Sequence, residues 1–513
     1  MAIYTGKMLT SDQTISADVC IVGSGAGGAV VAERLAKAGK RVVVLEEGGF
    51  NPSASFDLLE RNAYARMYQD KGGRATADGS ITILQGRGVG GTTVVNWTTC
   101  FRTPDWVLDH WAEHHGVQGP SSEVLRPHFE SLEKRLSVHR MQLSQVNRNN
   151  RVLWDGCKAL GYEVELLQRN VKRCAHTGYC GMGCPIDAKQ SMLTTLIPDA
   201  VTAGAEVYAN AAVEVVTGEG RRIQKAVARL RDPESDRPNG ITLTVEAPLF
   251  VLSCGGINTP ALLQRSGLNR NGRTGKRTFL HPAPIVVGVH EGLIEGFVGS
   301  PQYVASHAFA HRGEGRMGYM LEAAPVFPAQ FASGVFSMGL ELQSQLADLP
   351  HMSVGIALLH DGFDLHSPDE GATVSLLEDG SPQLSYAWSA RFEEALRDAA
   401  RRLAMVQFAA GAKSTQLSHT RRVAFSSPQE LDRMDRVPFG PGAVGVYSAH
   451  VMGGCAMGSN AANSVVDSSS LRHHEFDNLF VVDGSVLPTA ATVNPQMTIY
   501  GISSWAADGL LNL

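Results

Sequence analysis

A glycine-rich turn between two apolar segments constrains the fold of this chain more than any other feature. Residues 18–49, DVCIVGSGAGGAVVAERLAKAGKRVVVLEEGG, have the pattern of a buried strand, a glycine turn, an amphipathic helix and a second buried strand. In such a unit Gly23 permits the tight turn, Gly25 lets backbone approach a pyrophosphate, and Gly28 lets the helix pack closely on the sheet. The pattern predicts a dinucleotide-binding unit with the pyrophosphate at the helix N-terminus. The alternative is a glycine-rich turn in an ordinary βαβ unit.

An acid ends the second strand of this unit. Glu46 lies about 20 residues beyond the glycines, where a carboxylate accepts a hydrogen bond from a ribose hydroxyl. A carboxylate there favours a free 2′-hydroxyl over a 2′-phosphate, so NAD and FAD both fit and NADP does not. The position of the unit near the N-terminus suits an FAD enzyme whose cofactor domain leads the chain.

The composition is that of an ordinary globular protein with room for several domains. The chain has 513 residues, of which 43% are hydrophobic and 19% charged, and its net charge is −5. This charge gives no electrostatic case for binding nucleic acid or an anionic membrane. No apolar run approaches the roughly 18 residues that span a bilayer, and the polar N-terminus lacks a signal core. We therefore expect no integral membrane segment and a cytoplasmic location, with export on a partner subunit as the alternative.

The order of apolar and polar segments predicts an α/β fold (α+β overall) in which two domains are interleaved. A Rossmann-like cofactor domain is expected over 1–284, with helical and cysteine-rich insertions at roughly 105–200. Short apolar strands separated by turns predict a β-sheet substrate-binding cap over 285–420. A buried strand near residue 480 predicts that 421–513 returns to the cofactor domain. Helices are expected at 56–67, 106–111, 124–136, 152–160 and 392–410.

Four stretches together resemble the glucose–methanol–choline (GMC) oxidoreductase family. They are GSGAGG with its acid, GRGVGGTTVVNW at 86–97, GGINTPALLQRSG at 255–267, and SAHVMGGCAMG at 448–458 with VDGSVLPTAATVNPQMT at 482–498. Within the family, the chain looks most similar to long-chain alcohol oxidases and bacterial FAD-dependent glucose and alcohol dehydrogenases. The resemblance implies FAD, removal of a hydride from a carbon that bears an alcohol, and a β-sheet substrate domain.

The resemblance also implies which residues bind the cofactor. Family members with covalent FAD carry a histidine in the segment that matches 92–96, and here that segment is TTVVN, so we expect non-covalent FAD. The cofactor-binding residues that the resemblance implies are Gly23, Gly25, Ala26, Gly28, Glu46, Glu47, Arg87, Gly90, Gly91, Asn96, Val213, Gly255, Asp483, Gly484, Asn494, Gln496 and Met497.

Alcohol oxidation needs a base for the hydroxyl proton and a group that holds the alcohol oxygen. His450 is the expected catalytic base, because histidine titrates near neutral pH. The alternative is a structural histidine beside a glycine turn. Asn494 matches the family position that holds the alcohol oxygen, and as an amide it cannot act as a base. His281 matches a recurrent family position, to which we assign a packing role.

A cysteine-rich segment, CAHTGYCGMGC, adds a less common feature. Cys174, Cys180 and Cys184 are spaced so that three thiolates could meet at one metal centre. The spacing is similar to that in bacterial FAD-dependent glucose dehydrogenases, where three cysteines hold a three-iron (3Fe–4S) cluster. The segment predicts such a cluster; the alternatives are a structural metal and free or disulfide-bonded cysteines.

The sequence thus predicts an FAD-dependent alcohol dehydrogenase whose substrate carries an apolar chain or ring. The apolar character of residues 297–359 carries the substrate prediction, and the alternative is that these residues form the core of the cap. A cluster would pass electrons to an acceptor protein or quinone. The competing functions are an oxygen-reducing oxidase, a lyase similar to hydroxynitrile lyases, an NAD-dependent dehydrogenase and a non-catalytic flavoprotein.

Overall fold

Six parallel strands form the sheet that carries the glycine turn. The computed structural model describes residues 3–313, 315–367 and 371–513. Three central strands are buried along their whole length, which is typical of a parallel sheet covered on both faces. The strand order is β1 (Ile3–Tyr4), β10 (Glu206–Tyr208), β4 (Val42–Leu45), β3 (Val19–Val22), β14 (Leu249–Leu252) and β28 (Leu479–Val481). This arrangement confirms the predicted α/β class with a Rossmann-like unit.

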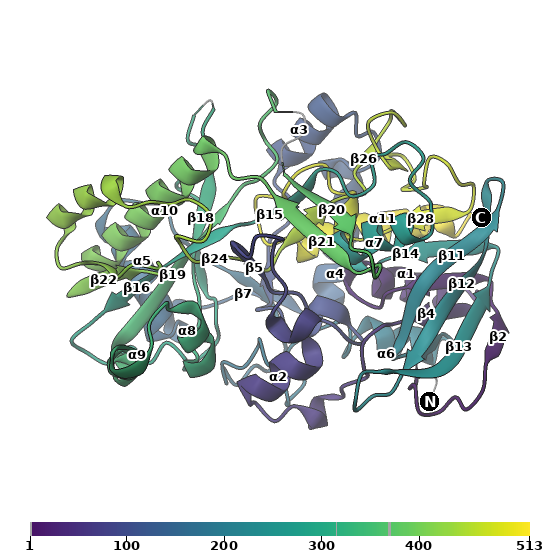
Figure 1. The fold of residues 1–513 in the computed structure, drawn as a ribbon, viewed down its shortest axis with the longest axis horizontal. Coiled ribbons are helices and arrows are strands. Elements are labelled where there is room, and N and C mark those ends of the chain that lie inside the picture. Colours follow the sequence, from purple (N-terminus) through teal and green to yellow (C-terminus); the bar gives the residue numbers. More distant parts are fainter. Residues whose placement is uncertain (1–2, 314, 368–370) are drawn as a thin grey trace.

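Helices and a second sheet cover this parallel sheet, in the right half of Figure 1. Helix α1 (Ala26–Lys37) follows the glycine turn and packs against α6 (Leu196–Thr202) and α11 (Gln496–Leu510). Helix α7 (Gly255–Arg265) follows β14 and contacts β11. The second sheet has the order β11 (Ala211–Glu219), β12 (Arg222–Arg231), β13 (Pro238–Glu246) and β2 (Gln13–Ser16).

A larger sheet forms the other lobe, in the left half of Figure 1. Helices α5 (Arg148–Ala159) and α10 (Ala390–Ala409) contact each other and pack on this sheet. Its main path is β23 (Val423–Phe425), β22 (Ser414–Leu417), β16 (Ala283–Val289), β19 (Met352–Leu359), β18 (Tyr319–Ala323), β17 (Val304–Ser306) and β8 (Glu165–Leu166), and β24 (Val446–Ser448) joins β16 to β5 (Ile81–Ile83).

The sheet of this lobe draws on more of the chain than the predicted cap at 285–420. Strands β5, β8, β23 and β24 come from outside that range, because the edges of the sheet are completed by hydrogen bonds to segments beyond it. Conversely, the hairpin of β20 (Ala372–Leu376) and β21 (Pro382–Tyr386) lies inside the range but belongs to a separate sheet. It pairs with β15 (Thr278–Leu280), which in turn pairs with β25 (Val451–Gly453).

The expected helices are present, with shifted ends. The first of them, α2, begins four residues later than expected, because Phe56 is extended and Leu58 has a φ of +62°. Three of the expected helices are α2 (Glu60–Met67), α3 (Asp105–His115) and α4 (Ser122–Arg135), and the other two are α5 and α10. Two further short helices are α8 (Pro328–Gly334) and α9 (Gly339–Ala347). The remaining strands are β6 (Thr99–Cys100), β7 (Val138–Arg140), β9 (Gln168–Asn170), β26 (Met457–Gly458) and β27 (Val466–Asp467).

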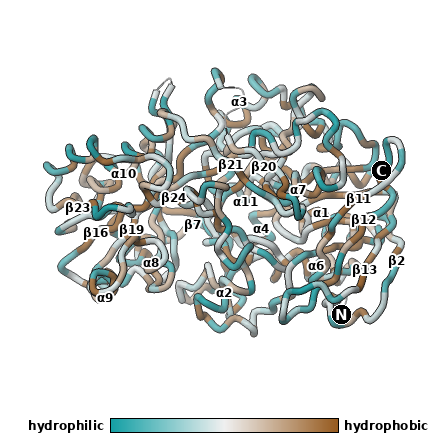
Figure 2. Tube along the Cα trace, in the orientation of Figure 1, coloured by the Kyte–Doolittle hydropathy of each residue, from teal (hydrophilic) through white to brown (hydrophobic). Residues whose placement is uncertain are grey.

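Hydrophobic residues follow the strands inside both lobes, and hydrophilic residues follow the outer loops (Figure 2). Buried apolar side chains form a large cluster around the parallel sheet and a second one between α10 and the sheet of the other lobe. Across the described ranges, no helix is both long enough and apolar enough to cross a bilayer.

Candidate active site

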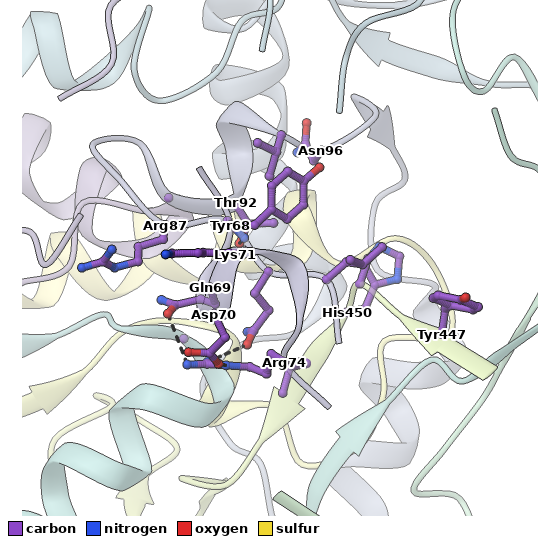
Figure 3. A pocket seen from close by; sticks show the side chains of 18 of the residues that line it. Tyr68, Gln69, Asp70, Lys71, Arg74, Arg87, Thr92, Asn96, Tyr447 and His450 are labelled. Atoms are coloured by element: carbon purple, nitrogen blue, oxygen red, sulfur yellow. Dashed lines mark hydrogen bonds and ion pairs between the residues drawn. The ribbon is translucent and has the colours of Figure 1, made fainter. Parts of the chain in front are cut away.

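One large cavity, of about 1450 Å³, runs from the glycine turn to the sheet of the second lobe. It begins at Gly23 and Gly25, passes Gly255 at the start of α7, and reaches His450 and Asn494. Figure 3 shows Asn96 and His450, which are far apart in the sequence, lining this same cavity. A cavity that joins a dinucleotide-binding turn to two polar side chains is suited to bring a cofactor and a substrate together.

The glycines at the cofactor end leave space that a side chain would fill. A Cβ on Gly25 would have only the Gly91 Cα within 4 Å, at 3.7 Å, and one on Gly255 would have only the Gln85 Nε2, at 3.9 Å. Helix α1 has no side-chain cap and no acid in its first turn, so its N-terminal N–H groups are free for an anion. The residues here therefore fit the pyrophosphate of a dinucleotide.

Most of the predicted cofactor-binding residues line the cavity, and three do not. Those that line it are Gly23, Gly25, Ala26, Glu46, Glu47, Arg87, Gly91, Asn96, Val213, Gly255, Asp483, Gly484, Asn494 and Gln496. Gly28 instead packs α1 on the sheet, where a Cβ would come within 2.0 Å of the Gly23 carbonyl oxygen. Gly90 lies against Leu193, and the Met497 side chain, 1% exposed, points into the core because it is on the buried side of α11.

Glu46 is buried and bonded mainly to the turn itself. Its carboxylate accepts hydrogen bonds from the Ser24 amide (3.1 Å), the Ser24 hydroxyl (2.7 Å) and the Gly48 amide (2.9 Å). Burial raises the pKa of Glu46, and the charge of Glu47 adds to this effect, while the hydrogen bonds oppose it. Glu46 thus fixes the glycine turn to the end of β4 while its edge lines the cavity.

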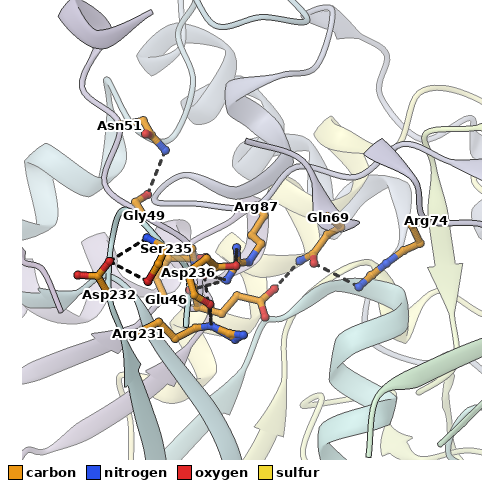
Figure 4. A network of polar contacts seen from close by, with 12 residues as sticks. Glu46, Gly49, Asn51, Gln69, Arg74, Arg87, Arg231, Asp232, Ser235 and Asp236 are labelled. Carbon is orange, nitrogen blue, oxygen red and sulfur yellow. Dashed lines mark hydrogen bonds and ion pairs between the residues drawn. The ribbon is translucent and has the colours of Figure 1, made fainter. Parts of the chain in front are cut away.

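Arg87 has a partner that sequence reasoning missed. Its guanidinium donates two hydrogen bonds, of 2.8 and 2.9 Å, to the carboxylate of Asp236 in the turn between β12 and β13 (Figure 4). Arg231 donates to the same carboxylate at 3.3 Å. The turn therefore lines the cofactor end of the cavity. The sequence showed only a polar hairpin at this position, with nothing to connect it to a residue 149 positions away.

A buried lysine ties the glycine-rich loop to the cysteine-rich segment. The Lys189 ammonium donates hydrogen bonds to the carbonyl oxygens of Val94 (2.6 Å), Asn96 (2.7 Å) and Cys180 (2.6 Å). Its burial lowers the pKa of Lys189 to about 8, although Cys180 and Cys184 act in the opposite direction. The segment therefore supports the wall of the cavity beside Asn96.

The cysteine geometry does not support the expected iron–sulfur cluster. All eight cysteines are free, and within the described ranges no group of three or more His, Cys, Asp or Glu side chains is arranged to hold a metal. Each sulfur has a different neighbour: Cys174 accepts from the His176 amide, Cys180 from the Arg169 guanidinium, and Cys184 from the Lys189 amide. The three cysteines, although close in sequence, thus accept separate hydrogen bonds.

His450 lies beside a second histidine at the far end of the cavity. Its Nδ1 is 3.0 Å from the Nδ1 of His281, so one ring must donate and the other accept. Burial lowers the pKa of His450 to about 4, and burial, together with the charge of His450, lowers the pKa of His281. Both rings are therefore neutral at neutral pH. His281, to which we assigned packing, directly contacts His450 and also lines the cavity.

Amide side chains organise another part of the cavity wall. Asn96 donates to the Gln496 Oε1 at 2.9 Å, and the Gln496 Nε2 donates to the Thr99 carbonyl oxygen at 2.5 Å. The Oδ1 of Asn494 is buried and has no hydrogen-bond partner in the described part of the chain. These bonds hold the loop before α11 against the loop after residue 91, so that Asn494 lies at the cavity.

The second lobe supplies an apolar wall. Alternating residues of two neighbouring strands face the cavity, as expected for one face of a sheet. They are Ala283, Ile285 and Val287 of β16 and Val354, Ile356 and Leu358 of β19. Two buried polar side chains, Gln302 and Glu322, interrupt this wall beside Asn494.

Sequence comparison identifies the family. Two GMC oxidoreductase profiles match residues 64–283 and 368–503, and a profile of an NAD(P)-binding Rossmann-like domain matches residues 21–51. An uncharacterized GMC-type oxidoreductase of Mycobacterium tuberculosis is 31% identical, over 97% of this chain and 76% of that protein. The chain belongs to the GMC oxidoreductase family.

The chain is also similar to a second GMC-type oxidoreductase, to a plant oxidase and to a bacterial oxidase of known structure. An uncharacterized GMC-type oxidoreductase of Sinorhizobium fredii is 30% identical, over 99% of this chain and 97% of that protein. A long-chain-alcohol oxidase of Arabidopsis thaliana is 30% identical, over 97% of this chain and 68% of that protein. The crystal structure of pyridoxine 4-oxidase from Mesorbium loti has the same fold, with a TM-score of 0.71, 17% identity, and coverage of 97% of this chain and 99% of that one.

The Lys189 contacts generate a prediction about stability. Replacing Lys189 by Met leaves three carbonyl oxygens without their donor, so we expect the free energy of unfolding to fall by about 3 kcal/mol. Lys172→Met, in the same segment but with an exposed side chain, is the matched control and should change it by less than about 0.5 kcal/mol. Denaturant unfolding of both variants measures the difference; equal effects would contradict a supporting role for Lys189.

Proposed function

We propose that this GMC oxidoreductase binds FAD and oxidises the CH–OH group of an alcohol with an apolar chain or ring, giving an aldehyde or ketone. The observation that carries the proposal is the position of His450 and Asn494, which line the cavity where its cofactor end meets the apolar wall. When bound, FAD supplies the acceptor for the hydride. Everything else that the reaction needs is a base, a holder for the alcohol oxygen and a pocket for the rest of the substrate.

The extent of the cavity supports FAD as the dinucleotide. The glycine turn and Gly255 fit a pyrophosphate, and the cavity continues past Arg87, Gly91 and Asn96 to Gln496. The family resemblance implies that Arg87, Gly91 and Asn96 lie along the pyrophosphate and the isoalloxazine, and that Gln496 lines the pyrimidine edge of the flavin. One structural neighbour is a formate oxidase of Aspergillus oryzae, an enzyme with FAD modification, with a TM-score of 0.69 and 16% identity over 98% of both chains.

The histidine pair sets the protonation state that His450 needs as a base. A neutral His450 accepts a proton at Nε2 only if its own proton is on Nδ1. Because the two Nδ1 atoms are 3.0 Å apart, that tautomer donates a hydrogen bond to the Nδ1 of His281. After proton transfer, the same bond stabilises the charged ring. His281 is therefore a positioning residue, and its neutral state, favoured by burial, keeps its Nδ1 lone pair available.

The apolar wall supports a substrate with a hydrocarbon chain or ring. Six aliphatic side chains of β16 and β19 line this end of the cavity. Few charged side chains on this wall could hydrogen-bond the hydroxyl groups of a sugar, and among them Glu322 is buried. An apolar pocket with few polar anchors favours an alcohol whose hydroxyl is its main polar group. The Arabidopsis relative, named a long-chain-alcohol oxidase, is consistent with this class.

We propose dioxygen as the electron acceptor, in place of the carrier that the cysteine spacing suggested. The Arabidopsis relative and the two structural neighbours are named oxidases, and the three cysteines have separate partners. In the balanced reaction the alcohol loses two electrons and two protons, and dioxygen gains them as hydrogen peroxide.

The first functional prediction concerns His450. We expect His450→Ala to keep its FAD but to slow flavin reduction by alcohol by about 10² to 10⁴-fold, because the general base is lost. Rapid mixing under anaerobic conditions, followed by flavin absorbance, measures the rate. His139→Ala, on the exposed strand β7, is the control and should react like the wild type. Reduction of the His450 variant at the wild-type rate would remove this residue from the mechanism.

The second prediction concerns the substrate. Long-chain aliphatic and aromatic primary alcohols should show a kcat/KM about tenfold or more above those of glucose and choline, because each buried CH₂ contributes about 0.8 kcal/mol. A substrate panel at one enzyme concentration measures this ranking. A preference for glucose or choline would contradict an apolar pocket.

The third prediction concerns the acceptor. In air, one hydrogen peroxide should form for each alcohol oxidised, at a rate independent of added one-electron acceptors. Peroxide assay and iron analysis of the same preparation test this. Stoichiometric iron, together with turnover that needs an added acceptor, would instead restore the cluster that the sequence suggested.

A further inference from the structure

A buried carboxyl group lies in the apolar wall next to Asn494. Glu322, on β18, is fully buried and lines the cavity. Its Oε2 accepts hydrogen bonds from the Gln302 Nε2 at 2.6 Å and from the Asn494 Nδ2 at 3.5 Å. Its Oε1 is buried and has no partner among the residues that the structure describes. No cation pairs with it in the described ranges, so a group costly to bury stands at the reacting end of the cavity.

Hydrogen bonds from Thr99 to Gln302 and from Gln302 to Glu322 hold the carboxyl group in place. The Thr99 hydroxyl donates to the Gln302 Oε1 at 2.6 Å, which directs the Gln302 Nε2 toward Glu322. Since Gln302 is held in this way, the Glu322 Oε2 is held too, and it faces the Asn494 amide. Because the Glu322 Oε2 is an acceptor, the Nδ2 of Asn494 faces it and the Oδ1 does not. One N–H of this Nδ2 donates to Glu322, and the second N–H is left for another acceptor.

Resting on the function proposed above, we propose that the Glu322 carboxylate orients the Asn494 amide so that its second N–H donates to the alcohol oxygen of the substrate. Glu322 is then a positioning residue that acts through Asn494, while His450 takes the hydroxyl proton. Asn494 was assigned to hold the alcohol oxygen, but an amide alone does not specify which of its ends faces the substrate. The carboxylate supplies that specification.

The ionisation of Glu322 controls the strength of this contact. A hydrogen bond to a carboxylate is roughly twice as strong as one between neutral groups. Protonation removes the charge and adds an O–H donor, so the amide is held less firmly. Burial raises the pKa of Glu322 to about 7, against the lowering effects of Asn494, Gln302 and His307.

Glu322 is a group at the reacting end of the cavity whose pKa lies near neutral pH. Its register partners on the neighbouring strands, Ala305 and Ile356, carry no charge. His307, the titratable group that acts on it, lies 3.4 Å from Glu165. The pKa of His450 is about 4, well below that of Glu322. Activity should therefore be present above pH 7 and fall as the pH drops through 7.

The test compares pH profiles of two Glu322 variants with a neutral control. For the wild type, kcat/KM for a primary alcohol should fall as the pH drops through 7, toward a plateau about 10- to 100-fold lower. Glu322→Gln keeps an acceptor oxygen without the titration, so its kcat/KM should stay flat until His450 titrates. Glu322→Leu removes the acceptor and should lower kcat by about 10- to 100-fold at pH 8. Met320→Leu, a buried neutral site two residues earlier on β18, should keep the wild-type profile.

A readout independent of turnover accompanies the profiles. The infrared C=O stretch of a protonated carboxyl group should appear in the FAD-loaded wild type as the pH drops through 7 and be missing in Glu322→Gln. A wild-type profile that turns only near pH 4, an unchanged profile in Glu322→Gln, or full activity of Glu322→Leu would each overturn the assignment. Failure of every alcohol to reduce the wild-type flavin would instead overturn the proposed function itself.

Discussion

The carboxylate of Asp483 joins the carboxyl ends of two strands on which the whole cavity depends. Its Oδ2 accepts from the Gly255 amide at 2.8 Å and the Thr259 hydroxyl at 2.6 Å, and its Oδ1 accepts from the Ser485 amide at 2.7 Å. Gly255 begins α7 after β14, and Asp483 follows β28, so segments about half a chain apart meet at one point. Ligand sites of parallel sheets form at such carboxyl ends. The cofactor end, with its glycine turn after β3, is built on this junction.

The reacting end depends on a second kind of constraint, the removal of water from polar groups. Two imidazoles in contact are both neutral because burial disfavours their charged forms. The same burial raises the pKa of Glu322 toward neutrality. The same desolvated region thus lowers the pKa of His450 and raises the pKa of Glu322. The two groups therefore titrate in different pH ranges.

Local sequence patterns predicted the parts of the structure that depend on near neighbours. The glycine unit at 18–49 was predicted because its strands, turn and helix are contiguous, and the family resemblance was confirmed by the GMC profiles. His450 and Asn494 do line one cavity. Their catalytic roles stay predictions.

What the sequence did not predict depends on contacts between distant residues. Nothing local connects Arg87 to Asp236, His281 to His450 or Glu322 to Asn494, because each pair meets only after the sheets have formed. The predicted iron–sulfur cluster in the cysteine-rich segment, which the structure does not support, depended on spacing alone. Spacing alone cannot show that Lys189 and Arg169 would bind its atoms separately. The edges of the larger sheet, at β5, β8 and β24, also come from distant segments.

The central claim is that FAD occupies this cavity and takes a hydride from an alcohol at its apolar end. The most direct measurement is the absorption spectrum of the purified protein before and after anaerobic addition of a long-chain primary alcohol. The account predicts the two flavin bands at the start and their loss on addition, with formation of the aldehyde in equal amount. A protein that carries no flavin, or whose flavin bands persist with every alcohol, would contradict it.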